Sequence, residues 1–152
     1  MTEKSAYAAL RRHLPKNARL DRVENLMVAG MPDCNLCLNG NEWWIEIKAP
    51  SKTPKRATTP LFGSNHRIMQ SQILWHTRQI RAGGNSGFLI CTDNHYAFIH
   101  GKYAPELNQM PLLRILALSL WYCKRRPATW NTLFPALIAN SKPNPTAINL
   151  TA

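Results

Sequence analysis

The sequence has few acidic residues, few cysteines and no long uninterrupted hydrophobic segment. Its most apolar run, residues 111–123, is too short to span a bilayer and contains Arg114. The first residues are polar and no apolar stretch follows them, so we expect no signal peptide. Four cysteines in 152 residues are ordinary usage for a reducing compartment, and the cytoplasm is the expected location. These features argue against a membrane protein and against a secreted domain held together by disulfides.

Acidic residues are scarce relative to basic ones. Eight Asp and Glu residues stand against nineteen Lys and Arg residues, which gives a formal charge of +11 and an isoelectric point near 10. A basic excess of this size indicates a polyanionic partner, most often nucleic acid and less often an anionic membrane surface. The length allows one domain, which we place at residues 1–126, followed by a Pro-rich C-terminal extension, 127–152, that is in part loosely held.

The order of predicted elements favours an α/β fold. Apolar periodicity and breakers predict helices over 2–14, 66–81 and 107–123, and single strands over 22–28, 88–92 and 96–100. Two further strands flank Asn39-Gly40, the strongest short hairpin signal in the chain. Alternating helices and strands of this kind form a mixed sheet with helices packed on it.

The hairpin register follows from the two-residue turn. If Asn39 and Gly40 form the loop, Leu38 pairs with Asn41 and every cross-strand pair sums to 79. One face is then entirely apolar and the other mostly polar, which supports this register. The apolar face carries Cys34, Leu36, Leu38, Trp43, Ile45 and Ile47.

The same register places Asp33 opposite Glu46 on the polar face. Like charges directly opposed destabilise a hairpin, so a positive group should compensate them. Lys48, two residues beyond Glu46 on the same face, is one candidate, and a divalent cation is the other. Carboxylate oxygens suit Mg²⁺ or Mn²⁺, and a metal beside a lysine on a strongly basic protein points to phosphodiester hydrolysis.

At these residues the sequence resembles a known family. Gly30-Met31-Pro32-Asp33 and Glu46-Ile47-Lys48 look like the signature of the PD-(D/E)XK nuclease superfamily, over about residues 1–100. Within it, the chain is most similar to the phage-type VRR-NUC and Holliday-junction-resolvase-like nucleases. The resemblance implies a restriction-endonuclease-like core, with a mixed central β-sheet flanked by helices. It also implies a metal-dependent endodeoxyribonuclease, with branched DNA among its candidate substrates.

The resemblance also implies roles for individual residues. Asp33, Glu46 and the backbone carbonyl of Ile47 would bind Mg²⁺, for which Mn²⁺ can substitute, and Lys48 would be catalytic. Gln72 matches the glutamine that faces the active site in related nucleases. Many members add a carboxylate from the first helix, and the sequence leaves open whether Glu3 or Glu24 takes that place. Glu24 is included among the candidate ligands because it precedes the motif.

Several basic clusters are candidate DNA contacts. The loop 49–64 follows Lys48 directly, so its basic residues lie where a phosphate backbone would pass. We therefore expect DNA to contact Lys52, Lys55 and Arg56 of this loop, together with Arg78 and Arg81 of the helix after it. A homodimer is an option, because symmetric cutting of a junction needs two active centres, but no residue decides it.

Simpler interpretations remain open beside these. Asp33, Glu46 and Lys48 could form a solvated polar face with a weak surface ion pair. Cys34-x-x-Cys37 could suggest zinc, but an odd spacing in a strand sends the two side chains to opposite faces, and no second pair exists. At the level of function, the alternatives are a catalytically idle DNA-binding module of the same fold and a basic phage protein that binds a host protein.

Overall fold

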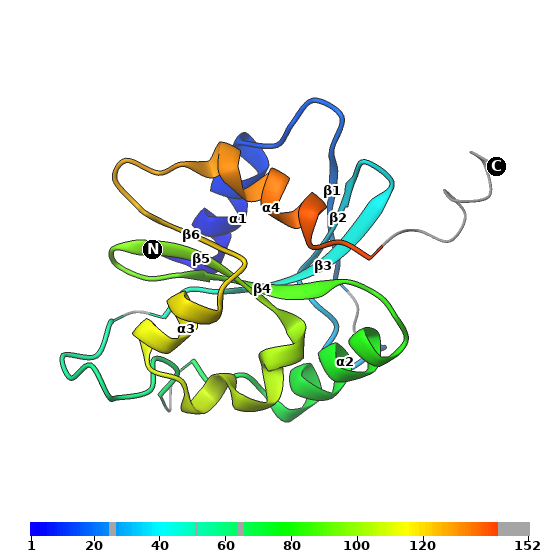
Figure 1. The fold of residues 1–152 in the computed structure, drawn as a ribbon. Coiled ribbons are helices and arrows are strands. Elements are labelled where there is room, and N and C mark those ends of the chain that lie inside the picture. The colour runs from blue at the N-terminus through cyan, green and yellow to red at the C-terminus, as the bar shows by residue number, and fades with distance from the viewer. Residues whose placement is uncertain (25–26, 51, 64–65, 143–152) are drawn as a thin grey trace.

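The computed structural model describes residues 1–24, 27–50, 52–63 and 66–142. A mixed sheet in the order β1-β2-β3-β4-β5-β6 forms the middle layer, and helices cover both of its faces (Figure 1). The α/β class, with a mixed central sheet flanked by helices, is therefore confirmed. The strands are β1 (Arg19–Arg22), β2 (Cys34–Leu38), β3 (Asn41–Lys48), β4 (Ser86–Cys91), β5 (His95–His100) and β6 (Trp121–Lys124). The helices are α1 (Glu3–Arg12), α2 (Gln70–Arg81), α3 (Leu112–Leu118) and α4 (Leu133–Ala139), with 3₁₀ segments η1 (Gly101–Gln109) and η2 (Trp130–Thr132).

Several strands begin or end at the same edge of the sheet. Neighbouring strands of this sheet are antiparallel, apart from β3 and β4, which run parallel and are joined by the crossover that contains α2. Consequently β3, β4 and β6 end at the same edge, and β2 and β5 begin there. We call it the Lys48 edge, and its members are Asp33, Lys48, Thr92, His95 and Lys124.

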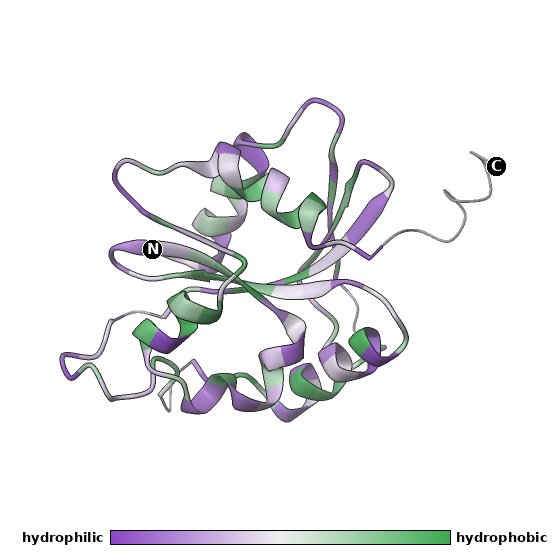
Figure 2. Ribbon diagram, in the orientation of Figure 1, coloured by the Kyte–Doolittle hydropathy of each residue, from purple (hydrophilic) through white to green (hydrophobic). Residues whose placement is uncertain are grey.

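The hydrophobic core has two parts, one on each face of the sheet. Helices α1 and α4 close the first part, which includes Leu10, Trp43 and Phe134. The segment η1 and helix α3 close the second, which includes Phe88 and Leu107. Figure 2 shows hydrophobic residues along the strands and on the helices that flank them, and hydrophilic residues at the loops.

The predicted hairpin register is confirmed. The pairs run from Cys34 with Ile45 to Leu38 with Asn41, and each sums to 79. Asn39 and Gly40 both have positive φ, as the two-residue turn requires. All six residues of the predicted apolar face are buried in the first part of the core.

The prediction of one helix over 107–123 is wrong. The region instead contains the end of η1, helix α3 and strand β6. Strand β6 pairs with β5 from Phe98–Trp121 to His95–Lys124, so it supplies hydrogen bonds that β5 would otherwise lack. Its burial alternates between Trp121 and Cys123 inside and Tyr122 and Lys124 outside. A short strand with only two inward residues leaves too little periodicity to separate it from an apolar helix.

Two other boundaries also differ from the sequence pattern. The first strand covers Arg19–Arg22, because its partner β2 reaches back only to Cys34, which pairs with Arg22. Of the predicted strand 22–28, residues 23, 24, 27 and 28 are not in a strand, and residues 25 and 26 lie outside the described part of the chain. The second predicted helix begins at Gln70 rather than at residue 66. Beyond residue 126, the chain packs four side chains into the first part of the core, namely Trp130, Leu133, Phe134 and Leu137. The last ten residues of the extension, 143–152, lie outside the described part of the chain.

Candidate functional site

Asp33 lies at the point where β2 begins and separates from β1. Its carboxylate Oδ2 accepts a 2.7 Å hydrogen bond from the backbone N–H of Ile47, two residues beyond the last hairpin pair on β3. Its backbone carbonyl accepts a 2.8 Å bond from the Val23 N–H. The side chain thus extends the hydrogen bonding of the hairpin and holds a carboxylate against the end of β3.

Gly30, three residues before Asp33, brings helix α2 close to this point. It has φ +79°, and a Cβ at this position would overlap the backbone of Ser71. Only glycine combines this backbone conformation with so close an approach. The Gly-x-Pro-Asp segment therefore packs against the first turn of α2 and places Asp33 near that helix.

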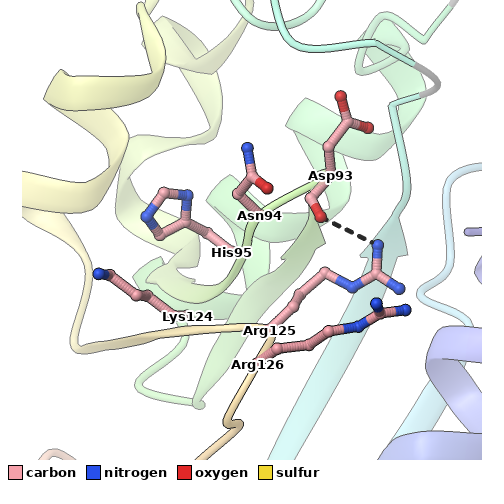
Figure 3. A pocket seen from close by; sticks show the side chains of 6 residues that line it. All are labelled: Asp93, Asn94, His95, Lys124, Arg125 and Arg126. Atoms are coloured by element: carbon pink, nitrogen blue, oxygen red, sulfur yellow. Dashed lines mark hydrogen bonds between the residues drawn. The ribbon is translucent and has the colours of Figure 1, made fainter.

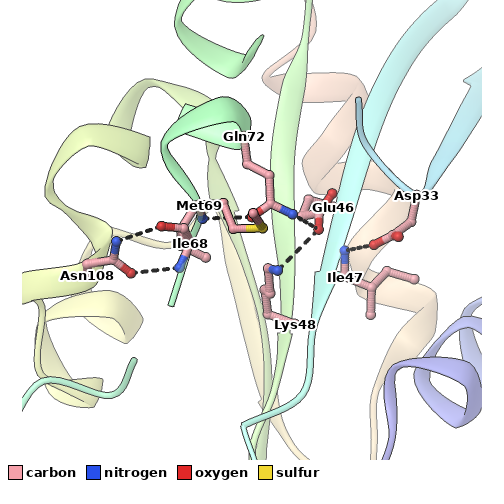
Figure 4. A network of polar contacts seen from close by, with 8 residues as sticks. All are labelled: Asp33, Glu46, Ile47, Lys48, Ile68, Met69, Gln72 and Asn108. Carbon is pink, nitrogen blue, oxygen red and sulfur yellow. Dashed lines mark hydrogen bonds and ion pairs between the residues drawn. The ribbon is translucent and has the colours of Figure 1, made fainter. Parts of the chain in front are cut away.

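Glu46 is the centre of a buried polar network (Figure 4). Its Oε1 lies 3.3 Å from the Lys48 ammonium and accepts a 2.7 Å hydrogen bond from the Gln72 side-chain amide. The Glu46 side chain is only 5% exposed and that of Lys48 is 11% exposed. A solvated surface pair is therefore the wrong interpretation of these two residues, because both are largely shielded from solvent.

Gln72 is itself held in a fixed orientation. Its Oε1 accepts a 2.9 Å bond from the Met69 N–H, which directs the amide nitrogen toward Glu46. The preceding residue, Ile68, is fixed by two hydrogen bonds between its backbone and the Asn108 amide, of 2.8 and 2.9 Å. The start of α2 is thus tied to η1, so the fold itself sets the position of the Gln72 amide.

Burial and charge act together on Glu46. Burial first and the Asp33 carboxylate second raise the pKa of Glu46, Lys48 opposes both, and the resulting pKa is about 8. Burial also raises the pKa of the Cys34 thiol to about 12, with Asp33 and then Glu46 acting in the same direction. The charge of Asp33 therefore acts on both Glu46 and Cys34. An added cation would stabilise this arrangement.

A small pocket opens beside Asp33. Its volume is about 30 Å³, and it is lined by Glu3, Tyr7, Arg22, Asp33 and Ile47. That space accommodates about one water or one small ion. Glu46 is not among the residues that line this pocket in the described structure, although the charge of the Glu3 carboxylate adds slightly to the rise in the Glu46 pKa that burial and Asp33 cause.

The two candidates for a third carboxylate are placed differently. Glu3 lies in the first turn of α1, where the Thr2 side chain caps the helix, and it lines the pocket with Asp33. The Glu24 side chain is 85% exposed and lies 4.0 Å from Arg22. The structure brings Glu3 to the site and does not bring Glu24 there. The sequence carries one signal for this choice, since Glu3 is the only acid in the first helix.

Metal-ligating side chains form no larger cluster within the described ranges. No group of three or more His, Cys, Asp or Glu side chains in this part of the chain is arranged to hold a metal ion. Cys34 is buried, whereas Cys37 on the other face is half-buried, and the described cysteines are all free. The Cys-x-x-Cys segment therefore does not form one half of a zinc site.

The predicted DNA contacts divide into two groups. The first group, Lys52, Lys55 and Arg56, belongs to the loop that follows β3 at the Lys48 edge, and all three side chains are exposed to solvent. Arg78 and Arg81 lie near the end of α2, and β4 begins shortly after it at the opposite edge. Because a helix rises 1.5 Å per residue, Arg81 lies roughly 13 Å farther along α2 than Gln72. The loop starts at the Lys48 edge, and Lys55 and Arg56 line a pocket with Leu112 and Leu113 beside α3, whereas the two arginines lie toward the opposite edge.

None of the helices in the described residues has the length and apolar character needed to cross a bilayer.

Similarity to known proteins is found at the level of structure. No protein-family model and no curated protein matches this chain. The chain is similar to the structure of Hjc, a Holliday junction resolvase from Archaeoglobus fulgidus, with 15% identity and a TM-score of 0.49. The match covers 77% of this chain and 89% of that one. Structural similarity at this level carries no information about activity, so the function has to be inferred from the residues of the site.

Proposed function

We propose that this protein is a metal-dependent endodeoxyribonuclease. The observation that carries the proposal is the buried Glu46, held by Lys48 and Gln72 beside the Asp33 carboxylate. Burying charged groups costs free energy, and such networks concentrate where a site needs a fixed charge arrangement. The chain that carries it has a net charge of +11, which suits a polyanionic substrate.

The donor set of the site fits Mg²⁺. Two neighbouring carboxylates and a backbone carbonyl are hard oxygen ligands, and Mg²⁺ usually takes one or two carboxylates and keeps several waters. Burial first, and the Asp33 charge second, raise the pKa of Glu46 despite Lys48, so a bound cation would favour the ionised form of this carboxylate. Asp33, Glu46 and the carbonyl of Ile47 would hold the ion, with Glu3 as the nearest further carboxylate and Mn²⁺ as a substitute.

The residues around the ion would have different roles in the reaction. When bound, a divalent cation lowers the pKa of a coordinated water and neutralises charge on the scissile phosphate. Lys48 would donate to the attacking water or to a phosphate oxygen, where a fixed ammonium stabilises developing charge. Gln72 would keep Glu46 in its orientation, because its amide is fixed by the Met69 N–H.

The resemblance to PD-(D/E)XK nucleases supports the same reaction. Asp33, Glu46 and Lys48 occupy the positions of that signature, and the hairpin register brings them to one end of β3. The narrower assignment to phage-type VRR-NUC or junction-resolving nucleases is part of this proposal, as is branched DNA as substrate. Symmetric cutting of a junction would require a homodimer.

The test is a cleavage assay on plasmid, linear, flap and four-way-junction DNA, with Mg²⁺ and again with EDTA. We expect cleavage that depends on Mg²⁺ and is lost in Asp33→Ala and Lys48→Ala. The exposed Asp21→Ala and Lys4→Ala variants serve as matched controls and should retain activity. Cleavage that persists in EDTA or in Lys48→Ala would contradict the mechanism. DNA binding without cleavage under all conditions would favour the idle DNA-binding module.

A further inference from the structure

A second pocket lies on the Lys48 edge, away from the carboxylates. It has a volume of about 460 Å³ and lies between the turn after β4 and the end of β6 (Figure 3). Its lining residues are Asp93, Asn94, His95, Lys124, Arg125 and Arg126. The proposed nuclease chemistry uses none of them.

Arg125 fixes the shape of this pocket. Its backbone N–H donates a 2.8 Å bond to the Asn94 carbonyl, and its guanidinium donates a 3.1 Å bond to the Asp93 carbonyl. The guanidinium also lies 5.8 Å from the centre of the Tyr96 ring. The turn and the end of β6 are thereby joined, so the walls of the pocket are held in place by the backbone.

The charge of the pocket is strongly positive. Lys124, Arg125 and Arg126 contribute three cations, and Asp93 contributes one carboxylate. Among the described residues, no Asp or Glu forms an ion pair with any of the three cations. Figure 3 shows the Asp93 carboxylate directed away from the two arginines, which extend together in one direction, while Lys124 extends in the opposite direction, beside His95. Adjacent guanidinium groups repel one another unless an anion lies between them, and they match phosphate oxygens in geometry.

The pocket and the carboxylate site lie along one edge. Lys48 pairs with Ile90, Ile90 with Ala97 and Ala97 with Tyr122, so Lys124 is two residues beyond the position of Lys48 and three strands away. With neighbouring strands about 4.8 Å apart, the two lysine backbones are on the order of 15 Å from each other. Such a spacing corresponds to a few nucleotides of a DNA strand, since phosphates along a duplex are about 3.4 Å apart per strand along the axis.

We propose that the pocket formed by Lys124, Arg125 and Arg126 with Asn94 and His95 binds a backbone phosphate of the DNA substrate, a few nucleotides from the phosphate held at Glu46 and Lys48. This inference rests on the proposed function. It assigns the path of the bound strand, from the carboxylate site across β4 and β5 to the end of β6.

The test measures DNA binding without cleavage. A fluorescein-labelled duplex of about 20 base pairs, long enough to span the roughly 15 Å between the two regions, is titrated with protein in EDTA at several salt concentrations, and anisotropy is recorded. The test variant is Lys124→Ala/Arg126→Ala, which leaves the structural Arg125 in place. The matched control is Arg12→Ala/Lys16→Ala, which also removes one lysine and one arginine, from the end of α1 and the turn after it.

We expect the test variant to bind about tenfold more weakly at low salt, with a salt slope reduced by about 0.9, as the loss of one phosphate contact predicts. The control should match the wild type, and Lys124→Arg/Arg126→Lys should restore binding. Equal binding and equal slopes for the two double variants would overturn the inference. Because no cleavage is involved, this result is independent of the Mg²⁺ assay. A protein that binds DNA normally but does not cleave it would contradict the proposed nuclease activity and would still be consistent with the phosphate pocket.

Discussion

The Lys48 edge carries two polar regions built in opposite ways. Around Glu46, charged side chains are almost entirely buried and each has a fixed partner. At the end of β6, Lys124 and Arg126 are exposed, and Arg125 alone of the three cations has a side chain fixed by a hydrogen bond within the described residues. Buried charges in a low-dielectric setting interact strongly and hold one geometry, whereas exposed cations act mainly through screened attraction. The first region therefore suits chemistry and the second suits substrate affinity.

The largest expected effect distinguishes the two regions by whether the cleavage rate or DNA binding changes. Lys48→Ala and Glu46→Gln should each lower the cleavage rate by about 10²–10³-fold, since removing a fixed charge-stabilising group has effects of this size. DNA binding in EDTA should change little. Cleavage and anisotropy assays on the same preparations check both points. Glu42→Gln, an exposed change on the same strand, is the control. If Glu46→Gln weakened DNA binding but kept the wild-type cleavage rate, the roles assigned to the two regions would be contradicted.

Gly30→Ala should disturb the buried region through the backbone. The added Cβ meets the backbone of Ser71, and the left-handed conformation at Gly30 adds strain, so we expect a loss of about 2–4 kcal/mol in the free energy of unfolding. Urea denaturation measures this loss. Gly63→Ala is the matched control, because a Cβ there meets nothing within 4 Å. Equal stability of the two variants would show that the contact between Gly30 and α2 has been assigned incorrectly.

The pH dependence of stability should distinguish the buried carboxylate from exposed ones. In EDTA the pKa of Glu46 is about 8 in the folded protein and near its ordinary 4.5 in the unfolded chain. The folded state thus retains a proton that the unfolded state has released, and the free energy of unfolding falls as pH rises from about 4.5 to 8. Glu46→Gln should remove this decline, which amounts to about 5 kcal/mol at most, since one pKa unit corresponds to about 1.4 kcal/mol. Mg²⁺ should reduce the same decline in the wild type, because it favours the ionised carboxylate. Parallel pH profiles for the wild type and Glu46→Gln would contradict the burial argument.

The smallest effect concerns the basic residues farther from both regions. Lys55→Ala/Arg56→Ala, on the loop at the Lys48 edge, should weaken duplex binding by about fivefold at low salt. Arg78→Ala/Arg81→Ala removes the same number of charges near the other end of α2 and should have less than half that effect. Anisotropy titrations compare the two. A larger loss for the α2 pair would place the DNA across that helix instead of along the edge.

The hairpin shows how much local pattern can predict. Asn39-Gly40 sets the turn, and the alternation of apolar and polar residues sets the register, so the local pattern alone groups Asp33, Glu46 and Lys48. Strand β6 shows the opposite case. Its residues read as the end of an apolar helix, and only the unpaired edge of β5 makes them a strand. The residues of a short segment do not indicate which distant strand it will pair with.

Composition and periodicities of a few residues were enough to predict the α/β class, the basic character and the end of β3 as the place where two acids and a lysine meet. They were not enough to predict that Glu46 is buried, that Glu3 rather than Glu24 lies near Asp33, or that Lys124, Arg125 and Arg126 share an edge with Lys48. Burial and the alignment of distant strands arise from packing the whole chain, and no local pattern encodes them.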